Sequence, residues 1–554
     1  MKIISFVYGE HCSGITVVED GKILYCYEEE RFTRVKTSTD WKNLTWRHPI
    51  KSLYELHYIN KVDINSFDVY LFPQIDGVDH LPIFFEDIKS HCNFHIDTDN
   101  MLKKAKYYDH HDAHCGLAYY TSGFVDKKCL VVSIDALGSG YSAKYFTAEN
   151  GKMKFIDGIG RDRISFGMYY AMLTEFIGFQ RLKDEGKIVG MSSHGSRVDF
   201  VFDCFDRAIG PLNGIKTRQY RDGNDGTMFC DFYNNFFETI GSEFYRNSKM
   251  INHIAYAGQT VFENKLCELF NNLHDLYPDY DHLCVSGGVF ANVKVNKKLN
   301  ELPWVKEMYV TPPMGDEGLT LGAVLMYNAK HGEQSVFRFD DVYLGSRYTD
   351  EQIISTFEMD KFKSFKSKIE YEPLNIEKVS QLLCDGHIVG LFQGRMEYGP
   401  RALGNRTILA DPRGSDIYNK LNGRLHRNDC MPFAPVVLDD HVETVFDVKK
   451  SKYTAEFMTM LYDTHPEWHD KIPAAVHPID KTARIQIVRE KNNPKLHSIL
   501  QSFYNRTGVP VLINTSFNVH EEPIVCWPEN ALDHLINGIV DYLIIEDRLV
   551  YLKK

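Results

Sequence analysis

The sequence lacks several features that would place it in a specialised class of proteins. Its twelve cysteines form no CxxC pair and keep no regular spacing, which argues against a disulfide framework and a structural zinc site. No segment approaches the roughly 18 consecutive apolar residues of a membrane span. The apolar run near the N-terminus is too short for a signal peptide. We therefore expect a soluble, cytoplasmic protein with no membrane partner.

An excess of positive charge is also absent. The 63 Lys and Arg residues are outnumbered by 75 Asp and Glu residues, and the formal charge is -12. A nucleic-acid partner held by bulk electrostatics usually requires a basic face, so we expect none. The pattern GxxxxGK[ST] does not occur, which excludes a P-loop as the nucleotide site. At 554 residues the chain is too long for one hydrophobic core, and at least two domains are expected.

Positive charge is concentrated in one stretch, GRMEYGPRALGNRTILADPR at residues 394–413, where only Glu397 and Asp411 oppose the arginines. Guanidinium groups stay ionised and match phosphate oxygens with planar forks, while glycines let backbone amides approach the same ligand. Arginines on loops are usually solvated, but apolar residues alternate with the charges here. The stretch predicts a site for phosphorylated ligands that includes Arg395, Gly399, Arg401, Arg406 and Arg413.

One local pattern occurs twice in the first half of the chain. A buried strand, a small-residue turn and a second strand lead into a hairpin at Asp20-Gly21, and the same succession leads to Asn150-Gly151. Asn or Asp followed by Gly is the preferred type I′ turn. The repetition predicts duplicated α/β halves that clamp a nucleotide. Two unrelated hairpins are the alternative.

Three histidines occur in the segment DHHDAH. If an aspartate begins a helix here, His110 and His114 lie four residues apart on one face, the spacing with which two imidazoles bind one metal ion. Single histidines on helices are more often core or surface residues. Asp135 and Asp316 each end an apolar stretch in a small-residue turn and are expected to complete the site. Such a mixed N/O set suits iron(II), manganese or zinc, and the sequence does not choose among them.

Two further segments of the first half are candidates for a nucleotide site. LCVSGGVFAN runs from an apolar strand into a double glycine that opens a helix, where backbone amides can approach a phosphate or ribose. RLKDEGKIVG is a weaker candidate. The residues that we predict to contact the nucleotide here are Lys187, Gly287, Gly288 and Asn292.

A fresh amphipathic pattern begins near residue 351, after a strand and a turn. We therefore predict two domains, residues 1–355 and residues 356–554. In the second domain, a strand at residues 388–393 leads into the arginine stretch.

Further polar residues of the second domain can join the arginine stretch. Arg427 lies in a segment rich in positive charge, and Arg484 is expected on an alternating strand at residues 480–488. The sequence NTSFN ends an apolar strand. It can bind a small planar amide or acid group, or form an ordinary polar turn, through Asn514, Thr515, Ser516 and Asn518.

Together these motifs resemble the carbamoyltransferase family that includes the nodulation, tobramycin and cephalosporin O-carbamoyltransferases. The second half shares GRMEYGPRALGNRTILADPR, MPFAPVVL, TARIQ, NTSFN and EEPIV, in order and spacing. The first half shares GEHCSG, EEERFTRVK, HHDAH, DEGKIVGM, SGGVFAN and GDEG. The resemblance implies a duplicated ribonuclease-H-like α/β domain of the actin and heat-shock ATPase superfamily, similar to the tRNA threonylcarbamoyl-transfer protein. An α/β domain like the threonylcarbamoyl-adenylate synthase is expected to follow it.

The resemblance implies a reaction in two stages. The second domain is expected to convert carbamoyl phosphate and ATP, which enters with Mg²⁺, into carbamoyl adenylate. Arg401 and Arg406 would stabilise charge on the transferring phosphate.

The first domain is then expected to transfer the carbamoyl group to a hydroxyl of a small molecule. His11 matches the residue that would accept the hydroxyl proton. One divalent metal, with iron(II) expected, would be held by His110, His114, Asp135 and Asp316. The resemblance also allows a homodimer.

The sequence departs from the family pattern beside Arg427. Either His426 or Leu425 stands where family members often have a lysine, and Met431 precedes PFAP. Arg427 is therefore the residue of this segment that we carry over. The rival functions are a sugar-kinase-like phosphotransferase of the same superfamily, a tRNA threonylcarbamoylation enzyme, and a catalytically inactive binding module that uses the nucleotide clamp as a switch. The acidic charge balance argues against the second.

Overall fold

The structure is a computed structural model. It describes residues 1–9, 12–36, 48–74, 81–160, 164–209, 250–333, 336–427 and 432–553. Among the helices of these ranges, none combines the length and hydropathy that a membrane crossing requires.

The chain divides into two compact units. The first unit comprises Met1–Leu24 and Thr37–Phe339, and the second comprises Tyr25–Lys36 and Asp340–Lys554. By compactness, the second unit therefore begins at Asp340 and also includes a short segment from early in the chain. The division of activities between residues 355 and 356 stays a prediction.

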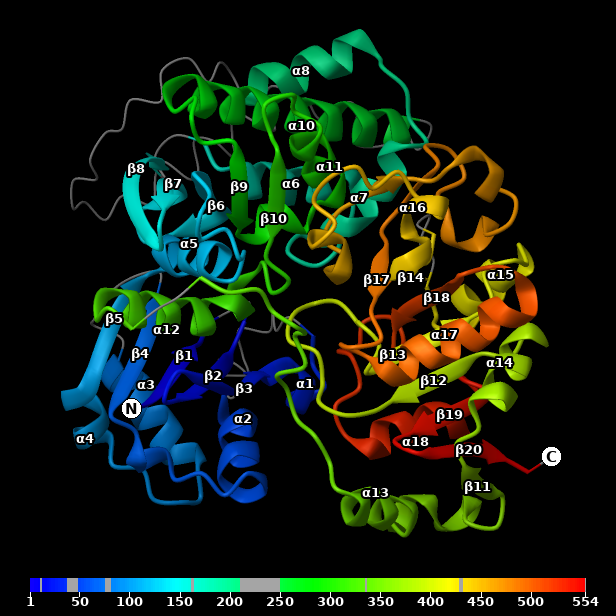
Figure 1. Cartoon of the computed structure of the whole chain (residues 1–554). Helices are drawn as coiled ribbons and strands as arrows, with labels where there is room; N and C mark the ends of the chain where they lie inside the picture. The colour runs from blue at the N-terminus through cyan, green and yellow to red at the C-terminus, as the bar shows by residue number, and fades with distance from the viewer. Residues whose placement is uncertain are drawn as a thin grey trace. The chain divides into compact units, whose positions relative to one another are not determined.

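Two five-stranded sheets with corresponding strand orders are built from residues 2–310 (Figure 1). The first has the order β3-β2-β1-β4-β5. Its strands are β1 (Lys2–Val7), β2 (Gly14–Glu19), β3 (Lys22–Glu28), β4 (Val69–Gln74) and β5 (Ala105–Asp109). The second has the order β8-β7-β6-β9-β10. Its strands are β6 (Cys129–Gly138), β7 (Tyr141–Glu149), β8 (Lys152–Gly160), β9 (His282–Ser286) and β10 (Glu307–Val310).

The strand directions repeat as well. β1 pairs antiparallel with β2 and parallel with β4, and β6 pairs antiparallel with β7 and parallel with β9. Both predicted hairpin turns form, and Asp20, Gly21, Asn150 and Gly151 all have the positive φ that a type I′ turn requires. The duplicated α/β fold is confirmed, and the alternative of two unrelated hairpins is wrong.

The first unit also contains helices. They are α2 (Ile50–Tyr54), α3 (Leu81–His91), α4 (Thr98–Lys104), α5 (His110–Tyr120), α6 (Phe166–Ile177), α7 (Glu185–Ser192), α8 (Asp199–Ile209), α10 (Ile251–Leu276), α11 (Val293–Asn300) and α12 (Leu319–Lys330).

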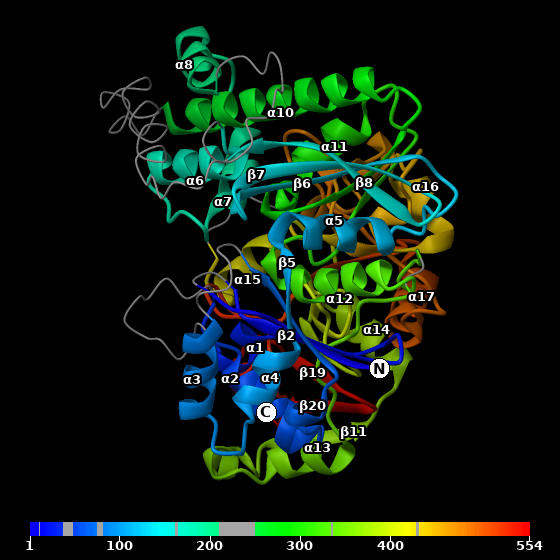
Figure 2. The ribbon, with the colours of Figure 1, turned by 90° about the vertical axis from the view of Figure 1, so that its left-hand side faces the viewer.

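Helices α5 and α12 lie side by side (Figures 1 and 2). A Cβ atom at Gly322 of α12 would lie 2.1 Å from the carbonyl oxygen of Ala113 in α5. A Cβ atom at Gly116 of α5 would lie 2.4 Å from Cγ of Met326. Because glycine has no Cβ, the two helices can approach this closely. The first turn of α5 is thereby held near the segment that precedes α12.

The second unit is built on a mixed eight-stranded sheet with the order β11-β20-β19-β12-β13-β18-β14-β17 (Figure 1). Its strands are β11 (Ile369–Pro373), β12 (Val389–Phe392), β13 (Arg406–Ala410), β14 (Pro435–Leu438), β17 (Gln486–Val488), β18 (Val511–Ser516), β19 (Tyr542–Ile545) and β20 (Arg548–Leu552). Its helices are α1 (Glu29–Thr33), α13 (Asp350–Phe357), α14 (Ile376–Cys384), α15 (Asp416–Arg424), α16 (Val442–Val445), α17 (Pro494–Thr507) and α18 (Pro528–Ile536).

The predicted strand before the arginine stretch is β12, whose Phe392 belongs to the buried core together with Ile408 and Ile513. The prediction of one strand that runs through Arg484 at residues 480–488 is wrong. Arg484 lies between two short strands, β16 (Thr482–Ala483) and β17, which pair with different partners, β15 (Tyr462–Asp463) and β14. The chain changes from one sheet to another at this residue, and alternation alone does not reveal that.

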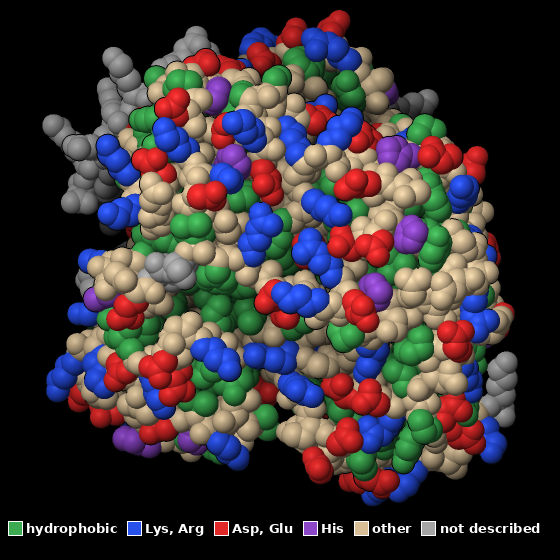
Figure 3. Space-filling view, viewed as in Figure 1, with side chains coloured by type: hydrophobic (Ala, Val, Ile, Leu, Met, Phe, Trp, Pro, Cys, Tyr) green, Lys and Arg blue, Asp and Glu red, His purple; other side chains and the backbone are tan. Residues whose placement is uncertain are grey.

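Basic and acidic side chains are interspersed over the face of the molecule that Figure 3 shows. Neither sign of charge forms a continuous field on this face.

Candidate functional site

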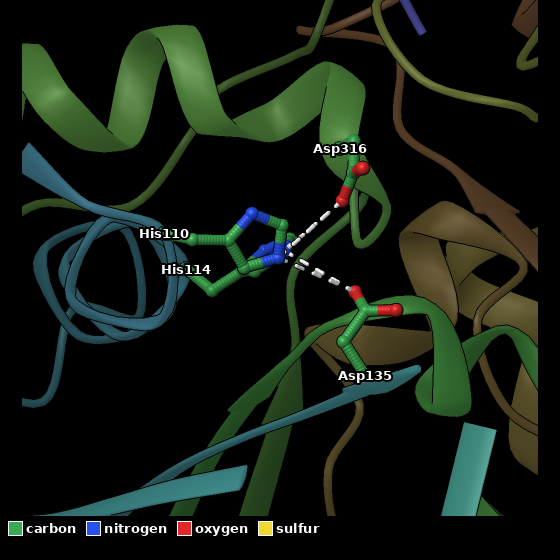
Figure 4. A group of neighbouring side chains, drawn as sticks. All are labelled: His110, His114, Asp135 and Asp316. Atoms are coloured by element: carbon green, nitrogen blue, oxygen red, sulfur yellow. Dashed lines mark ion pairs between the residues drawn. The ribbon is translucent and has the colours of Figure 1, made fainter. Parts of the chain in front are cut away.

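Four side chains from three elements meet in the first unit (Figure 4). His110 and His114 project from the first two turns of α5, Asp135 lies on β6, and Asp316 begins the short 3₁₀ turn before α12. Helix α5 begins where predicted, because the Asp109 side chain caps it by accepting a hydrogen bond from the backbone N–H of Asp112. The structure thus brings together all four residues that we predicted as metal ligands.

The distances in this group suit a cation better than direct hydrogen bonds. Nε2 of His110 lies 3.9 Å from Asp135 and 3.7 Å from Asp316, and Nε2 of His114 lies 3.4 Å and 3.5 Å from the same carboxylates. Both imidazoles are buried, and their Nε2 atoms have no hydrogen-bond partner among the described residues. Buried polar atoms are normally satisfied, so these nitrogens require an occupant. Two nitrogen and two carboxylate ligands fit a divalent metal.

The surroundings hold the ligands in place. Asp135 accepts hydrogen bonds from the backbone N–H groups of Ala136 and Gly288. Nδ1 of His114 lies 3.0 Å from the hydroxyl of Ser286. Such partners fix the orientation of metal ligands. A Cβ atom at Gly138 would lie 2.4 Å from Cδ2 of His110, so this position leaves room for the imidazole only as glycine.

Electrostatics in the group favour a bound cation. Burial opposes the charged form of His114, but the carboxylates of Asp135 and Asp316 outweigh it and raise the pKa of His114 to about 9. Burial also opposes ionisation of Asp135, but its two histidine neighbours outweigh it and hold the pKa of Asp135 well below its usual range. The two carboxylates that favour the protonated form of His114 also attract any other cation placed among the four side chains.

His111 is not part of this group. Its Nδ1 lies 2.8 Å from the hydroxyl of Ser133, and its Nε2 lies 3.0 Å from the carbonyl oxygen of Tyr141. Burial and the neighbouring His110 lower the pKa of His111 to about 3. Its imidazole is therefore a neutral, hydrogen-bonded core residue.

The predicted nucleotide residues of the first unit occupy several environments. Gly287 has a φ of 104°, and the N–H of Gly288 binds the metal-site residue Asp135. Asn292 caps α11 and exchanges hydrogen bonds with Gln259. Lys187 pairs with Asp184 at 2.8 Å. The double glycine therefore adjoins the metal group, while the role of these residues in nucleotide binding stays a prediction.

In the second unit, the arginine stretch folds around an acid that sequence reasoning treated only as a counter-charge. The buried carboxylate of Glu397 accepts hydrogen bonds from the backbone N–H groups of Leu403, Asn405 and Arg406. Residues 397–406, which we call the arginine loop, thus close on one carboxylate. The signal for this role in the sequence is that Glu397 is a single acidic residue flanked by turn-forming residues.

Two arginines of the stretch bind backbone carbonyls. Arg406 has 0% exposure, and its two Nη atoms donate to four carbonyl oxygens while its guanidinium covers the ring of Phe392. Arg395 donates to the carbonyl oxygens of Leu344 and Gly345. The exposed Arg413 forms an ion pair with the buried Asp411. The predicted catalytic role of Arg406 stays a prediction, and the contacts observed are those of a residue that holds the loop.

Arg427 contacts the polar NTSFN turn, a contact that the sequence analysis did not predict. Its guanidinium donates to the side-chain oxygens of Thr515, Ser516 and Asn518 at 2.9–3.2 Å. Asn514 is directed elsewhere: it accepts a hydrogen bond from Thr407 and donates to Ala402, and it also contacts Gln486. Three of the four predicted residues of the turn therefore orient Arg427, and Asn514 joins the strands beneath them.

Arg484 is buried and is influenced by the charges of two arginines from other parts of the second unit. Burial and the positive charges of Arg401 and Arg427 lower the pKa of Arg484 well below its usual range. Nε of Arg484 is buried and has no hydrogen-bond partner among the described residues. A group of like charges of this kind is relieved by an anion. His11, the predicted base, and Met431 lie outside the described residues.

Two family models match separate parts of the chain. Residues 86–325 match the family model described as Carbamoyltransferase N-terminus, and residues 380–552 match Carbamoyltransferase C-terminus. An uncharacterised protein of Methanocaldococcus jannaschii is 31% identical over 98% of both chains. The nodulation protein NolNO of Sinorhizobium fredii is 26% identical over 98% of this chain and 79% of its own.

Among solved structures, T. kodakarensis HypF is similar over 60% of this chain and 48% of its own, with 13% identity and a TM-score of 0.34. The two family matches and the full-length similarity to these relatives lead to one conclusion: the chain is an enzyme of the carbamoyltransferase family.

Proposed function

We propose that this enzyme is an ATP-dependent O-carbamoyltransferase that works in two steps. In the second unit, water hydrolyses carbamoyl phosphate to carbamate and inorganic phosphate, and an oxygen of the carbamate attacks the α-phosphorus of ATP. Carbamoyl adenylate forms and pyrophosphate leaves. In the first unit, a hydroxyl group of a small-molecule acceptor attacks the carbamoyl carbon, AMP leaves, and His11 accepts the hydroxyl proton.

The group of Arg401, Arg427 and Arg484 carries this proposal. Two phosphorylated substrates repel each other, and the α-phosphate gains charge as it is attacked, so the first step requires several fixed cations in one place. The positive charges that lower the pKa of Arg484 would attract an anion that binds among the three arginines. Arg427 is already oriented by the three oxygens of the NTSFN turn.

The other residues of the second unit support these three. We assign Arg395 and Arg406 to holding the arginine loop through backbone carbonyls, with Arg401 presented to the substrates. Arg413, paired with Asp411, lies at the end of the same stretch. ATP is expected to enter with Mg²⁺, since the metal neutralises phosphate charge.

In the first unit, His110, His114, Asp135 and Asp316 would hold one divalent metal, for which iron(II) is our first choice. When bound, such an ion neutralises phosphate charge or polarises a carbonyl group. Gly287, Gly288, Asn292 and Lys187 are proposed to hold the nucleotide part of the adenylate. The N–H of Gly288 contacts Asp135, which links the proposed nucleotide residues to the metal group.

We propose a small-molecule hydroxyl acceptor, such as a sugar, an antibiotic or another natural product, rather than a nucleic acid or a membrane. The interspersed charges of the face in Figure 3 support this choice, because a polyanion partner requires a field of one sign. The enzyme is expected to work in the cytoplasm, and a homodimer is compatible with the proposal.

A coupled pyrophosphate assay tests the first step. Pyrophosphate is expected only when ATP and carbamoyl phosphate are both present. A sugar-kinase-like enzyme would instead form ADP from ATP and an acceptor alone. A threonylcarbamoylation enzyme would accept threonine and bicarbonate in place of carbamoyl phosphate, so pyrophosphate release with that pair would overturn the proposal.

A further inference from the structure

A segment from early in the chain completes the second unit. Residues 25–36 belong to this unit, although more than 300 residues separate them from the rest of it. Their central part forms the short helix α1, which begins directly after Glu28. The buried charged groups of this segment include Glu28 and Arg31, with 7% and 1% exposure.

Both charged groups bind the backbone of Gly399 in the arginine loop. The N–H of Gly399 donates to Oε1 of Glu28 at 2.7 Å, and Nη2 of Arg31 donates to the carbonyl oxygen of Gly399 at 2.6 Å. Glu28 and Arg31 also pair with each other at 3.2 Å. One residue of the loop is therefore held on both its donor and its acceptor side by one ion pair.

The loop needs such an anchor at this point. Gly399 has a φ of 107°, a conformation that side-chain-bearing residues rarely adopt, and it lies outside any helix or strand. The Glu397 carboxylate fixes the later part of the loop through Leu403, Asn405 and Arg406. Gly399 lies between Glu397 and Arg401, so its two hydrogen bonds fix the part of the loop that leads directly to Arg401.

We infer that Glu28 and Arg31 are positioning residues of the adenylate-forming site, which hold Gly399 and thereby set the place of Arg401 relative to Arg427 and Arg484. The inference rests on the proposed function for the meaning of the site. The site of the second unit is then assembled from two distant parts of the chain. A misplacement of about 1 Å in a reacting group can cost a factor of roughly 100 in rate.

The direct test is Arg31→Lys in the full-length enzyme. Lysine keeps the charge but cannot place a planar fork across both Glu28 and Gly399. We expect the KM for carbamoyl phosphate in pyrophosphate release to rise by about tenfold or more, in a protein that has a lower unfolding temperature but still unfolds in one cooperative transition. Glu28→Gln keeps an acceptor for the Gly399 N–H and is expected to have a smaller effect than Glu28→Ala.

The matched control is Arg34→Lys. Arg34 lies on the same segment but donates to the carbonyl oxygens of Pro523 and Ile524, which are not residues of the arginine loop. The KM of the Arg34→Lys enzyme for carbamoyl phosphate is expected to stay within about twofold of the KM of the unmodified enzyme. If both lysine variants raise KM equally, or if Arg31→Lys leaves KM unchanged in a folded protein, the inference is wrong.

A second measurement separates this inference from the proposed function. Binding of inorganic pyrophosphate, followed by calorimetry, requires the arginines to be in place but requires no reaction. If the unmodified enzyme releases no pyrophosphate from ATP and carbamoyl phosphate, the proposed function fails. The inference then still predicts that Arg31→Lys weakens pyrophosphate binding by about tenfold while Arg34→Lys does not. Equal binding by both variants contradicts it.

Discussion

Nε2 of His114 lies 3.4 Å from Oδ2 of Asp135, and neither side chain is bonded directly to the other in the ordinary range of 2.7–3.2 Å. The imidazole belongs to a helix and the carboxylate to a strand of the neighbouring sheet, yet both are directed at the same point (Figure 4). The backbone N–H groups of Ala136 and Gly288 hold the carboxylate there. This arrangement gives a cation a preformed place.

Removing His114 is expected to remove the metal. His114→Ala deletes one of four ligands, so the metal content of the purified enzyme, measured by elemental analysis, should fall from one ion per chain to a small fraction of that. Pyrophosphate release from ATP and carbamoyl phosphate should continue, because that step is assigned to the other unit. His111→Gln is the control, since His111 is buried in the same helix but directed at Ser133 and Tyr141. Equal metal loss in both variants would count against the site.

Packing between α5 and α12 is expected to control metal binding at a distance from the ligands. Gly322→Ala would place a Cβ atom 2.1 Å from the carbonyl oxygen of Ala113, so the helices must separate. We expect a loss of stability of about 1–3 kcal/mol and weaker metal binding in a titration. Gly186→Ala is the control, because nothing lies within 4 Å of a Cβ atom there. If a destabilised Gly322→Ala enzyme bound metal with normal affinity, packing of α5 against α12 would not control metal binding.

The repeated hairpins and the histidine spacing were readable from the sequence, because both depend on local rules. A type I′ turn requires two residues with positive φ, which Asp20-Gly21 and Asn150-Gly151 supply, and two histidines at a spacing of four residues share one helix face. Contacts between distant segments followed no such rule. The links from Glu28 and Arg31 to Gly399 depend on where the fold places residues 25–36, and no local pattern encodes this.

Residue type alone could not distinguish the arginines. Arg406 and Arg427 both read as phosphate-binding residues, but Arg406 is buried against four carbonyl oxygens while Arg427 rests on three side-chain oxygens. A guanidinium group satisfies either environment, and the choice depends on which backbone groups the fold leaves without a partner.

Arg427→Lys is expected to abolish most of the pyrophosphate release. A lysine cannot donate to Thr515, Ser516 and Asn518 and also meet a phosphate with a planar fork. We expect the rate to fall by a factor of roughly 100 with an unfolding temperature near that of the unmodified enzyme. Arg424→Lys, three residues earlier, changes a residue that pairs with Asp541 and should retain the activity. A fully active Arg427→Lys enzyme would remove Arg427 from the proposed anion site.

Asp541 is expected to make the second unit sensitive to acid. Burial opposes its ionisation, but hydrogen bonds from Arg424 and from the backbone N–H of Ile388 outweigh it and lower the pKa of Asp541. A carboxylate whose pKa is lower in the folded than in the unfolded state stabilises the fold above its unfolded pKa of about 3.9. This stabilisation is lost as the pH falls through the folded pKa. Asp541→Asn should therefore cost about 1–2 kcal/mol near pH 7.

Thermal unfolding of both proteins, from pH 8 down to the lowest pH at which they stay folded, measures this effect. The difference in unfolding temperature should be constant above about pH 5 and should shrink below about pH 4, where Asp541 begins to bind a proton in the unfolded chain. A difference that grows on acidification would mean that Asp541 is protonated more readily in the folded protein, contrary to its contacts with Arg424 and Ile388.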